Sequence, residues 1–71
     1  MAHSVYKVIT LIGSSSESWE KAASAAIAQA AKSLRDLRIA RVIDQDIQIE
    51  AGKPNMYRLK LEVSFKYEGG S

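Results

Sequence analysis

Residues 57–67, with the sequence YRLKLEVSFKY, decide how this chain folds. Apolar side chains occupy every second position of the stretch, and polar side chains occupy the positions between them. This period of two is typical of a β-strand with one buried face, because successive side chains of a strand point to opposite sides. The apolar face is expected to consist of Tyr57, Leu59, Leu61, Val63, Phe65 and Tyr67.

Two further strands are expected upstream of this one. Residues 5–12 are rich in β-branched and aromatic side chains, which indicates a strand that is nearly buried on both faces and ends at Gly13. Residues 39–50 are also strand-like, but their apolar positions change phase partway along. A shift of one residue moves every side chain to the other face, so we expect a β-bulge or a sharp bend within residues 43–46. The segment AGKPN at residues 51–55 should form the turn before the last strand.

The segment between the first two strands has the periodicity of a helix. Its apolar residues follow the i, i+3, i+4, i+7 spacing of one helical face, namely Trp19, Ala22, Ala23, Ala26, Ile27, Ala30, Ala31 and Leu34. Three serines precede it, and Ser14 and Glu17 have the spacing of a capping box. We expect Glu17 and Lys21 to form an i, i+4 ion pair, and we expect Lys32 and Arg35 to lie in the last turn.

These elements predict an α+β fold of the order β-α-β-β, in which a three-stranded antiparallel sheet with the last strand in its centre wraps on one helix. Residues 1–71 should form a single domain with its core in residues 5–67 and a flexible tail at residues 68–71. The two C-terminal strands should reach roughly 40 Å and the helix only about 30 Å. Because the sheet outruns its cover and has open edges, we expect the chain to assemble with copies of itself.

Composition narrows the classes of protein. The chain has 71 residues and no cysteine, so a disulfide cannot reinforce its small core, and self-association or a metal is expected instead. The formal charge is +2, with basic and acidic residues interleaved, which argues against nucleic acid as a partner. No apolar run approaches the roughly 20 residues that span a bilayer, and no signal-peptide layout precedes the first strand. We therefore expect a cytoplasmic protein without a membrane partner.

Three stretches carry a family resemblance, namely VYKV at residues 5–8, GSSSESW at residues 13–19 and VSF at residues 63–65. Through them, and through the order and lengths of its elements, the chain resembles the dodecins over about residues 5–67. The resemblance implies a hollow homododecamer of β-α-β-β subunits. It also implies storage of a flavin, FMN or riboflavin, in stacked pairs near the threefold axes.

The ligand pocket departs from that family pattern at two positions. Ile39 stands where flavin-storing dodecins have the tryptophan that stacks on the isoalloxazine ring, and an aliphatic side chain cannot supply that stacking. Arg58 stands where those proteins have a glutamine that reads the flavin edge, and arginine has donors only. Asp44 matches an acidic position near the ligand. The segments RIAR at residues 38–41 and DQD at residues 44–46 are similar to a branch of the family described as binding calcium.

Each candidate site has an alternative interpretation. Asp44 and Asp46 share one strand face and are the candidate ligands for Ca²⁺, but cross-strand pairing with Arg58 or Lys60 is the commoner role of such residues. Ile39 and Arg58 could instead lie in an interface between subunits. The serine run is expected to cap the helix rather than bind an anion, and Trp19 is expected in the core or an interface.

No catalytic residues are expected. The chain has one histidine, His3, near its N-terminus, and no pairing of a nucleophile with a base is visible. The sequence therefore predicts a non-enzymatic, homo-oligomeric protein that binds or stores a small molecule, with flavin stacking lost. The alternative prediction is a structural or calcium-binding assembly with no flavin role.

Overall fold

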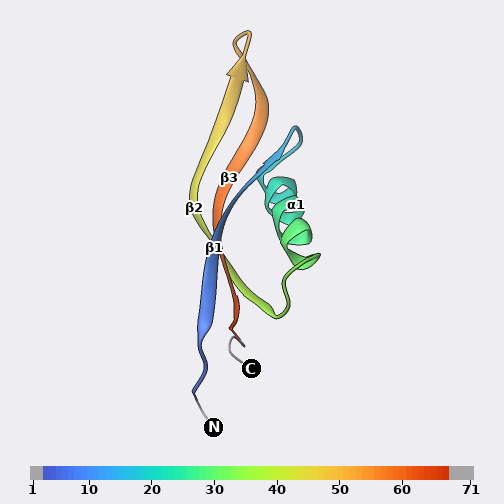
Figure 1. The fold of residues 1–71 in the computed structure, drawn as a ribbon. Helices are drawn as coiled ribbons and strands as arrows, with labels where there is room; N and C mark the ends of the chain where they lie inside the picture. The colour runs from blue at the N-terminus through green and yellow to red at the C-terminus, as the bar shows by residue number, and fades with distance from the viewer. Residues whose placement is uncertain (1–2, 68–71) are drawn as a thin grey trace.

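The computed structural model describes residues 3–67. It contains strand β1 (Tyr6–Ser15), helix α1 (Trp19–Ala31), strand β2 (Leu37–Glu50) and strand β3 (Lys53–Lys66), as Figure 1 shows. The strands form one antiparallel sheet in the order β1-β3-β2. The predicted β-α-β-β fold with the last strand in the centre is therefore confirmed. The expected tail at residues 68–71 lies outside the described residues.

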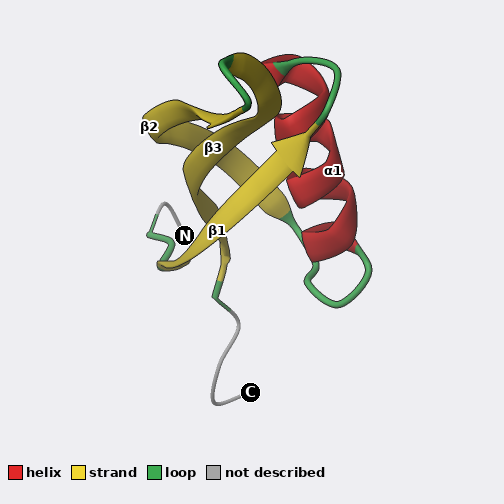
Figure 2. Cartoon of the chain, turned by 90° about the horizontal axis from the view of Figure 1, so that it is seen from above, coloured by secondary structure: helices red, strands yellow, loops and turns green. Residues whose placement is uncertain are grey.

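The core lies between helix α1 and one face of strand β3. Leu59, Leu61 and Val63 are buried at alternating positions of the strand, and Ala22 and Ala26 of the helix pack against them. Figure 2 shows the helix lying across one side of the sheet. The alternation thus marks the buried face correctly at Leu59, Leu61 and Val63, whereas Tyr67 at the end of the stretch is exposed. The alanine stripe lets the helix backbone approach the sheet, so the strands supply most of the core volume.

Gly13 has a different role from the one expected of it. Strand β1 does not end there but continues to Ser15, with Gly13 paired to Leu59. A Cβ atom at Gly13 would lie 2.2 Å from the carbonyl oxygen of Ala22. The glycine is therefore needed for the close approach of strand and helix, and it does not terminate the strand. The expectation that β1 is buried on both faces is also wrong for a single chain, because Val8 and Ile12 are exposed.

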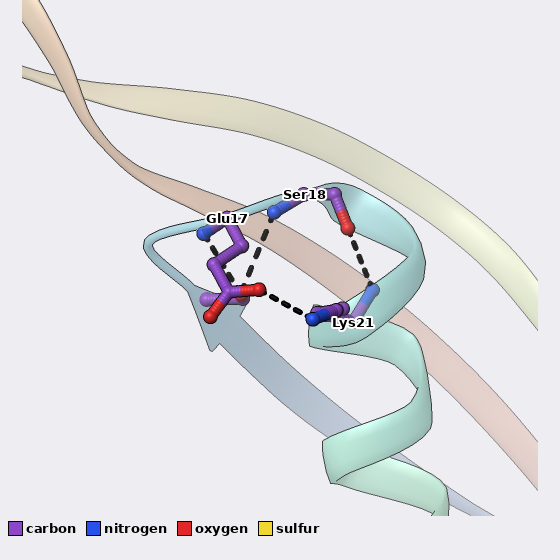
Figure 3. Close-up of polar contacts among 4 residues, drawn as sticks. Glu17, Ser18 and Lys21 are labelled. Atoms are coloured by element: carbon purple, nitrogen blue, oxygen red, sulfur yellow. Dashed lines mark hydrogen bonds and ion pairs between the residues drawn. The ribbon is translucent and has the colours of Figure 1, made fainter.

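The start of the helix differs from the predicted capping box. Ser18 is the N-cap, and its Oγ accepts a hydrogen bond from the backbone N–H of Lys21 at 3.0 Å (Figure 3). Ser15 Oγ accepts from the N–H of Glu17 at 3.0 Å. Ser14 cannot cap the helix because the strand runs past it. The predicted ion pair of Glu17 with Lys21 is present, with both side chains largely exposed (Figure 3).

The end of the helix also comes earlier than its apolar pattern predicted. The helix stops at Ala31, so Lys32 is the C-cap and no basic residue lies in the last turn. The N–H of Leu34 still donates to the carbonyl oxygen of Ala30, so this carbonyl at the C-terminal end of the helix has a hydrogen-bond partner. Arg35 and Asp36 belong to the connection to strand β2, where Asp36 has a positive φ.

Strand β2 contains the predicted irregularity. Val42 pairs with Leu61 and Asp44 pairs with Lys60, which leaves Ile43 as the extra residue of a bulge. Two further register shifts occur, one between Leu37 and Ile39 and one between Gln48 and Ile49. The turn that follows is shorter than expected: only residues 51–52 form it, and residues 53–55 already belong to strand β3.

The β2–β3 hairpin extends well past the helix, as Figure 1 shows. The molecule measures 55 × 20 × 16 Å along its principal axes. We call residues 47–56, the distal end of this hairpin, the arm. None of the arm's side chains is buried, and the apolar Ile49 is 69% exposed. The predicted overhang of the sheet is confirmed.

Candidate functional site

A small hollow lies on the sheet face at the base of the arm. Its lining comes from all three strands, namely Ile12, Asp44, Asp46, Arg58, Leu59 and Lys60. The register explains why these residues meet, because Lys60 pairs with Ile12 on one side and Asp44 on the other. Two residue pairs further along, on the same face, Arg58 pairs with Asp46. The sheet thus gathers two carboxylates and two cationic side chains at one place.

Asp46 and Arg58 form a bidentate ion pair across the strands. Arg58 Nε donates to Asp46 Oδ1 at 2.7 Å, and Arg58 Nη2 donates to Oδ2 at 2.9 Å. Through this hydrogen bonding and its charge, Arg58 lowers the pKa of the Asp46 carboxyl, and burial opposes the shift. Asp46 in turn raises the pKa of Arg58. In a single chain, Asp46 is therefore engaged in cross-strand pairing, which was the alternative to its role as a Ca²⁺ ligand.

Asp44 is the other carboxylate of the hollow, and its hydrogen bonding differs from that of Asp46. Its Oδ1 accepts from the backbone N–H of Gln45 at 3.0 Å. It lies opposite Lys60 in the register, yet it forms no ion pair with any residue of the described range 3–67. Asp44 is thus the carboxylate of the hollow that remains available to an external cation.

The hollow is connected to the helix through the only tryptophan of the chain. Trp19 Nε1 donates to the backbone carbonyl oxygen of Asp46 at 3.2 Å. The indole ring also meets Tyr57 edge-on, with ring centroids 5.2 Å apart. Trp19 packs against the core cluster, as the sequence predicted. Its contact with Asp46 joins residues 27 apart in the chain, and no local pattern in the sequence signals it.

Ile39 lies apart from the hollow. It pairs with Ser64, whose Oγ donates to the carbonyl oxygen of Ile39 at 3.4 Å. Its side chain is 67% exposed and lines a second depression together with Ile27, Leu37, Arg38, Ala40 and Val63. Of the three residues predicted to form the family's ligand pocket, one chain brings Asp44 and Arg58 together and leaves Ile39 elsewhere. Only contacts between copies of the chain could unite them.

A second cross-strand ion pair lies beyond the hollow. Arg41 Nη2 and Glu62 Oε1 are 3.3 Å apart, and both side chains are exposed to solvent. Neither residue lines the hollow. Like Asp46 with Arg58, it joins a guanidinium to a carboxylate, but it lacks the bidentate geometry of that pair. Arg41 is therefore a natural control for experiments on Arg58.

The size and ligand count of the hollow restrict what it can hold. Its volume is about 70 Å³, whereas sites for drug-sized molecules measure about 300–1,000 Å³. Within residues 3–67, no group of three or more His, Cys, Asp or Glu side chains comes together. One chain thus offers room for an ion and a few waters, with an incomplete set of ligands. His3 is exposed and lies outside this hollow.

The remaining predicted sites are simple to place. None of the serines at residues 14–16 is the helix N-cap: Ser15 Oγ accepts from the backbone N–H of Glu17 before the helix, and Ser18 is the cap. In the described part of the chain, no helix has the length and apolar character needed to cross a membrane.

Comparisons with known proteins find a matching family model and relatives with the same fold. The family model described as Dodecin matches residues 5–68. The calcium dodecin of Mycobacterium tuberculosis is 54% identical over 63 residues, which cover 89% of each chain. A crystal structure of that relative, described as a calcium-chelating antigen with a novel calcium-binding site, superposes with a TM-score of 0.83, covering 96% of this chain and 97% of the other.

Two other solved dodecins share the fold. A dodecin structure from Thermus thermophilus matches with a TM-score of 0.88 and 38% identity, covering 93% of this chain and 98% of that one. The dodecin of Streptomyces coelicolor matches with a TM-score of 0.93 and 27% identity, covering 99% and 100%. With its family model, its fold and its relatives in agreement, this chain belongs to the dodecin family.

Proposed function

We propose that this chain is the subunit of a non-enzymatic, homo-oligomeric dodecin that binds Ca²⁺ and has lost flavin stacking. The observation that carries the proposal is Asp44, whose carboxylate has no ion-pair partner within residues 3–67 and lies in one hollow with Asp46. The 54% identity with a calcium dodecin supports the same ligand. The subunit is a single domain of residues 1–71 with its core in residues 5–67.

The assembly follows from what one chain lacks. Ca²⁺ takes six to eight oxygen ligands, and the hollow of one subunit offers two carboxylates. Copies related by symmetry supply the missing oxygens where their hollows meet. The exposed apolar side chains of the arm and of strand β1 are covered in the same step, which gives a hollow dodecamer of the family type. A shell that carries many such sites would buffer or store the cation.

The proposal excludes flavin as the main ligand on chemical grounds. Ile39 presents an aliphatic side chain where a ring would be needed for stacking, and stacking is worth about 0.5–1.5 kcal/mol beyond area burial. Arg58 is already engaged with both oxygens of Asp46, and it has no acceptor for a flavin N–H. Neither side chain can replace its counterpart in a flavin-storing pocket.

Calorimetric titration of Ca²⁺ into the chelator-treated assembly tests this function. We expect binding by the parent and at least tenfold weaker binding by Asp44→Asn, because the amide retains the shape but lacks the charge. Glu17→Gln is the matched control, since Glu17 is an exposed acid that precedes the helix and forms an ion pair with Lys21 of the helix. Parent protein that releases no heat with Ca²⁺, or equal binding by Asp44→Asn, would contradict the proposal.

A second candidate function, binding of a flavin-like small molecule, is favoured by the apolar depression beside Ile39. Fluorescence titration with riboflavin distinguishes it from the first. We expect weak binding by the parent, a gain from Ile39→Trp, and a further, coupled gain when Arg58→Gln is added. Tight binding by the parent would favour this second function. No gain in the double variant would show that the pocket shape itself is lost.

A further inference from the structure

We infer that Arg58 sets the affinity and selectivity of the hollow for metal ions, because it is a cation of the protein itself that competes with an incoming ion for Asp46. This inference rests on the proposed Ca²⁺ site and assigns a role to a residue that is not a ligand. It follows from the pairing geometry, the charges around the hollow and the way in which the pair is held.

The geometry places the guanidinium where a metal would bind. Its two N–H groups occupy both carboxylate oxygens of Asp46, at 2.7 and 2.9 Å. A carboxylate has about four lone-pair directions, and a bidentate arginine uses the two that a bidentate Ca²⁺ would use. A cation can therefore engage Asp46 fully only after Arg58 turns away. In contrast, Asp44 needs no such rearrangement.

The charges of the hollow point to the same role. Asp44 and Asp46 contribute two negative charges, and Arg58 and Lys60 contribute two positive charges, so the four side chains sum to zero. A monovalent ion that displaces the guanidinium from Asp46 only exchanges one unit charge for another and gains little. A divalent ion has twice the charge and gains more from each carboxylate that it reaches. The resident arginine thus filters out Na⁺ and K⁺ at the expense of Ca²⁺ affinity.

Arg58 is held in this position by the fold around it. Asp46 and Arg58 are direct partners in the β2–β3 register. The backbone of Asp46 accepts the hydrogen bond of Trp19, and Trp19 contacts Tyr57, the neighbour of Arg58. The carboxylate is therefore fixed at a defined place beside the guanidinium. The same arrangement puts the only indole ring next to the site, so tryptophan fluorescence can report its occupation.

The test compares Ca²⁺ titrations of the intact assembly for the parent, Arg58→Gln and two control variants that also remove one positive charge. Lys60→Gln removes a cation that lines the hollow without an ion pair to Asp46. Arg41→Gln removes the arginine of the other cross-strand pair, outside the hollow. Light scattering on each variant checks that the assembly has the mass of the parent, and Trp19 fluorescence follows binding independently of heat.

We expect Arg58→Gln to bind Ca²⁺ about tenfold more tightly than the parent, since it removes a unit charge that competes with the ion for the same carboxylate. Lys60→Gln should gain about threefold and Arg41→Gln less than twofold. Sodium and potassium at physiological strength should weaken Ca²⁺ binding more in Arg58→Gln than in the parent. Adding Asp46→Asn should cancel most of the gain, because the competition concerns that carboxylate.

The outcomes separate this inference from the proposed function. Parent binding without a gain in Arg58→Gln overturns the inference alone. An equal gain in Arg58→Gln and Lys60→Gln also overturns it, because net charge would then explain the result. Binding by Arg58→Gln but not by the parent overturns the proposed function and supports the inference. If no variant binds Ca²⁺, both are wrong.

Discussion

The two ends of the sheet are built from similar residues but bury them to very different degrees. Under the helix, Leu61 of strand β3 is 1% exposed, whereas Ile49 on the arm is 69% exposed. Both are large aliphatic residues on strands, so their propensities do not explain the difference. The helix covers one end and ends before the other (Figure 1). The comparison shows that this chain completes its core at one end only, and in the proposed assembly a neighbouring copy covers the other end.

The hollow lies at the boundary between these two regions. Trp19, the first residue of the helix, contacts Asp46 and Tyr57 where the arm begins. On the covered side, burial within one chain fixes the strands. On the side of the arm, one subunit brings two carboxylates to the hollow. Under the proposed function, such a site is positioned by the fold and completed by the assembly.

The largest effect is expected at the closest approach of the covered end. Gly13→Val places a Cβ atom 2.2 Å from the carbonyl oxygen of Ala22, so strand and helix must separate. We expect a loss of at least 3 kcal/mol in the free energy of unfolding, at the upper end of overpacking costs. Denaturant unfolding of the purified variant measures it. Gly52→Val, on the open turn of the arm, is the control for a glycine without close neighbours, although its positive φ adds some strain. Equal stability of parent and Gly13→Val would show that the helix does not approach the sheet so closely.

The next effect contrasts the two ends directly. Leu61→Ala should cost about 2–5 kcal/mol, because it leaves a cavity in the core beneath the helix. Ile49→Ser should leave the subunit's own core intact and weaken the association of subunits instead. Light scattering over a dilution series should then show dissociation of Ile49→Ser at a higher protein concentration than the parent. A variant at Ile49 that assembles like the parent would show that this part of the arm stays uncovered.

A smaller effect is expected at the start of the helix. Ser18→Ala removes the acceptor of the Lys21 N–H and should cost about 1 kcal/mol, the usual value of an N-cap. Ser14→Ala is the matched control, because Ser14 lies in strand β1 and caps nothing. Thermal unfolding of both variants gives the comparison. A larger loss of stability for Ser14→Ala than for Ser18→Ala would indicate that Ser14 caps the helix, as the predicted capping box requires.

Much of the covered end could be predicted from the sequence, because its signals are local and periodic. The alternation at residues 57–67 marks the buried face of β3, and the change of phase in β2 marks the bulge at Ile43. The role of Gly13 and the cap at Ser18 could not be predicted. Where β1 ends depends on how closely the helix packs against it, which is a tertiary property.

The candidate site was predictable only in part. Asp44, Asp46 and Arg58 stood out by residue type and by family resemblance, and cross-strand pairing was one of their predicted roles. The contact of Trp19 with Asp46 depends on how the helix lies against the hairpin, so it has no local signal. The separation of Ile39 from the hollow was also not predicted, because the resemblance described a pocket shared between subunits.

The smallest effect concerns pH at the boundary between the two regions. Arg58 lowers the pKa of Asp46 in the folded protein, so the pair contributes stability above the ordinary pKa of the carboxyl and loses it as the pH falls through the lowered value. Parent protein should therefore be slightly more stable than Asp46→Asn at pH 7. This difference should shrink below about pH 4, where the unfolded carboxyl takes up its proton. A difference that stays constant down to pH 2 would indicate that the ion pair contributes nothing.

The most direct test of the central claim is the mass of the folded protein in solution. The exposed arm and the open strands predict that folded chains exist as a closed assembly, so light scattering at micromolar concentration should give many times the 7.8 kDa of one chain. The proposed dodecamer sets the expected value at about twelve times that mass. A folded, cooperatively unfolding monomer of 7.8 kDa would contradict the account, because the arm would then be stable without any neighbour to cover it.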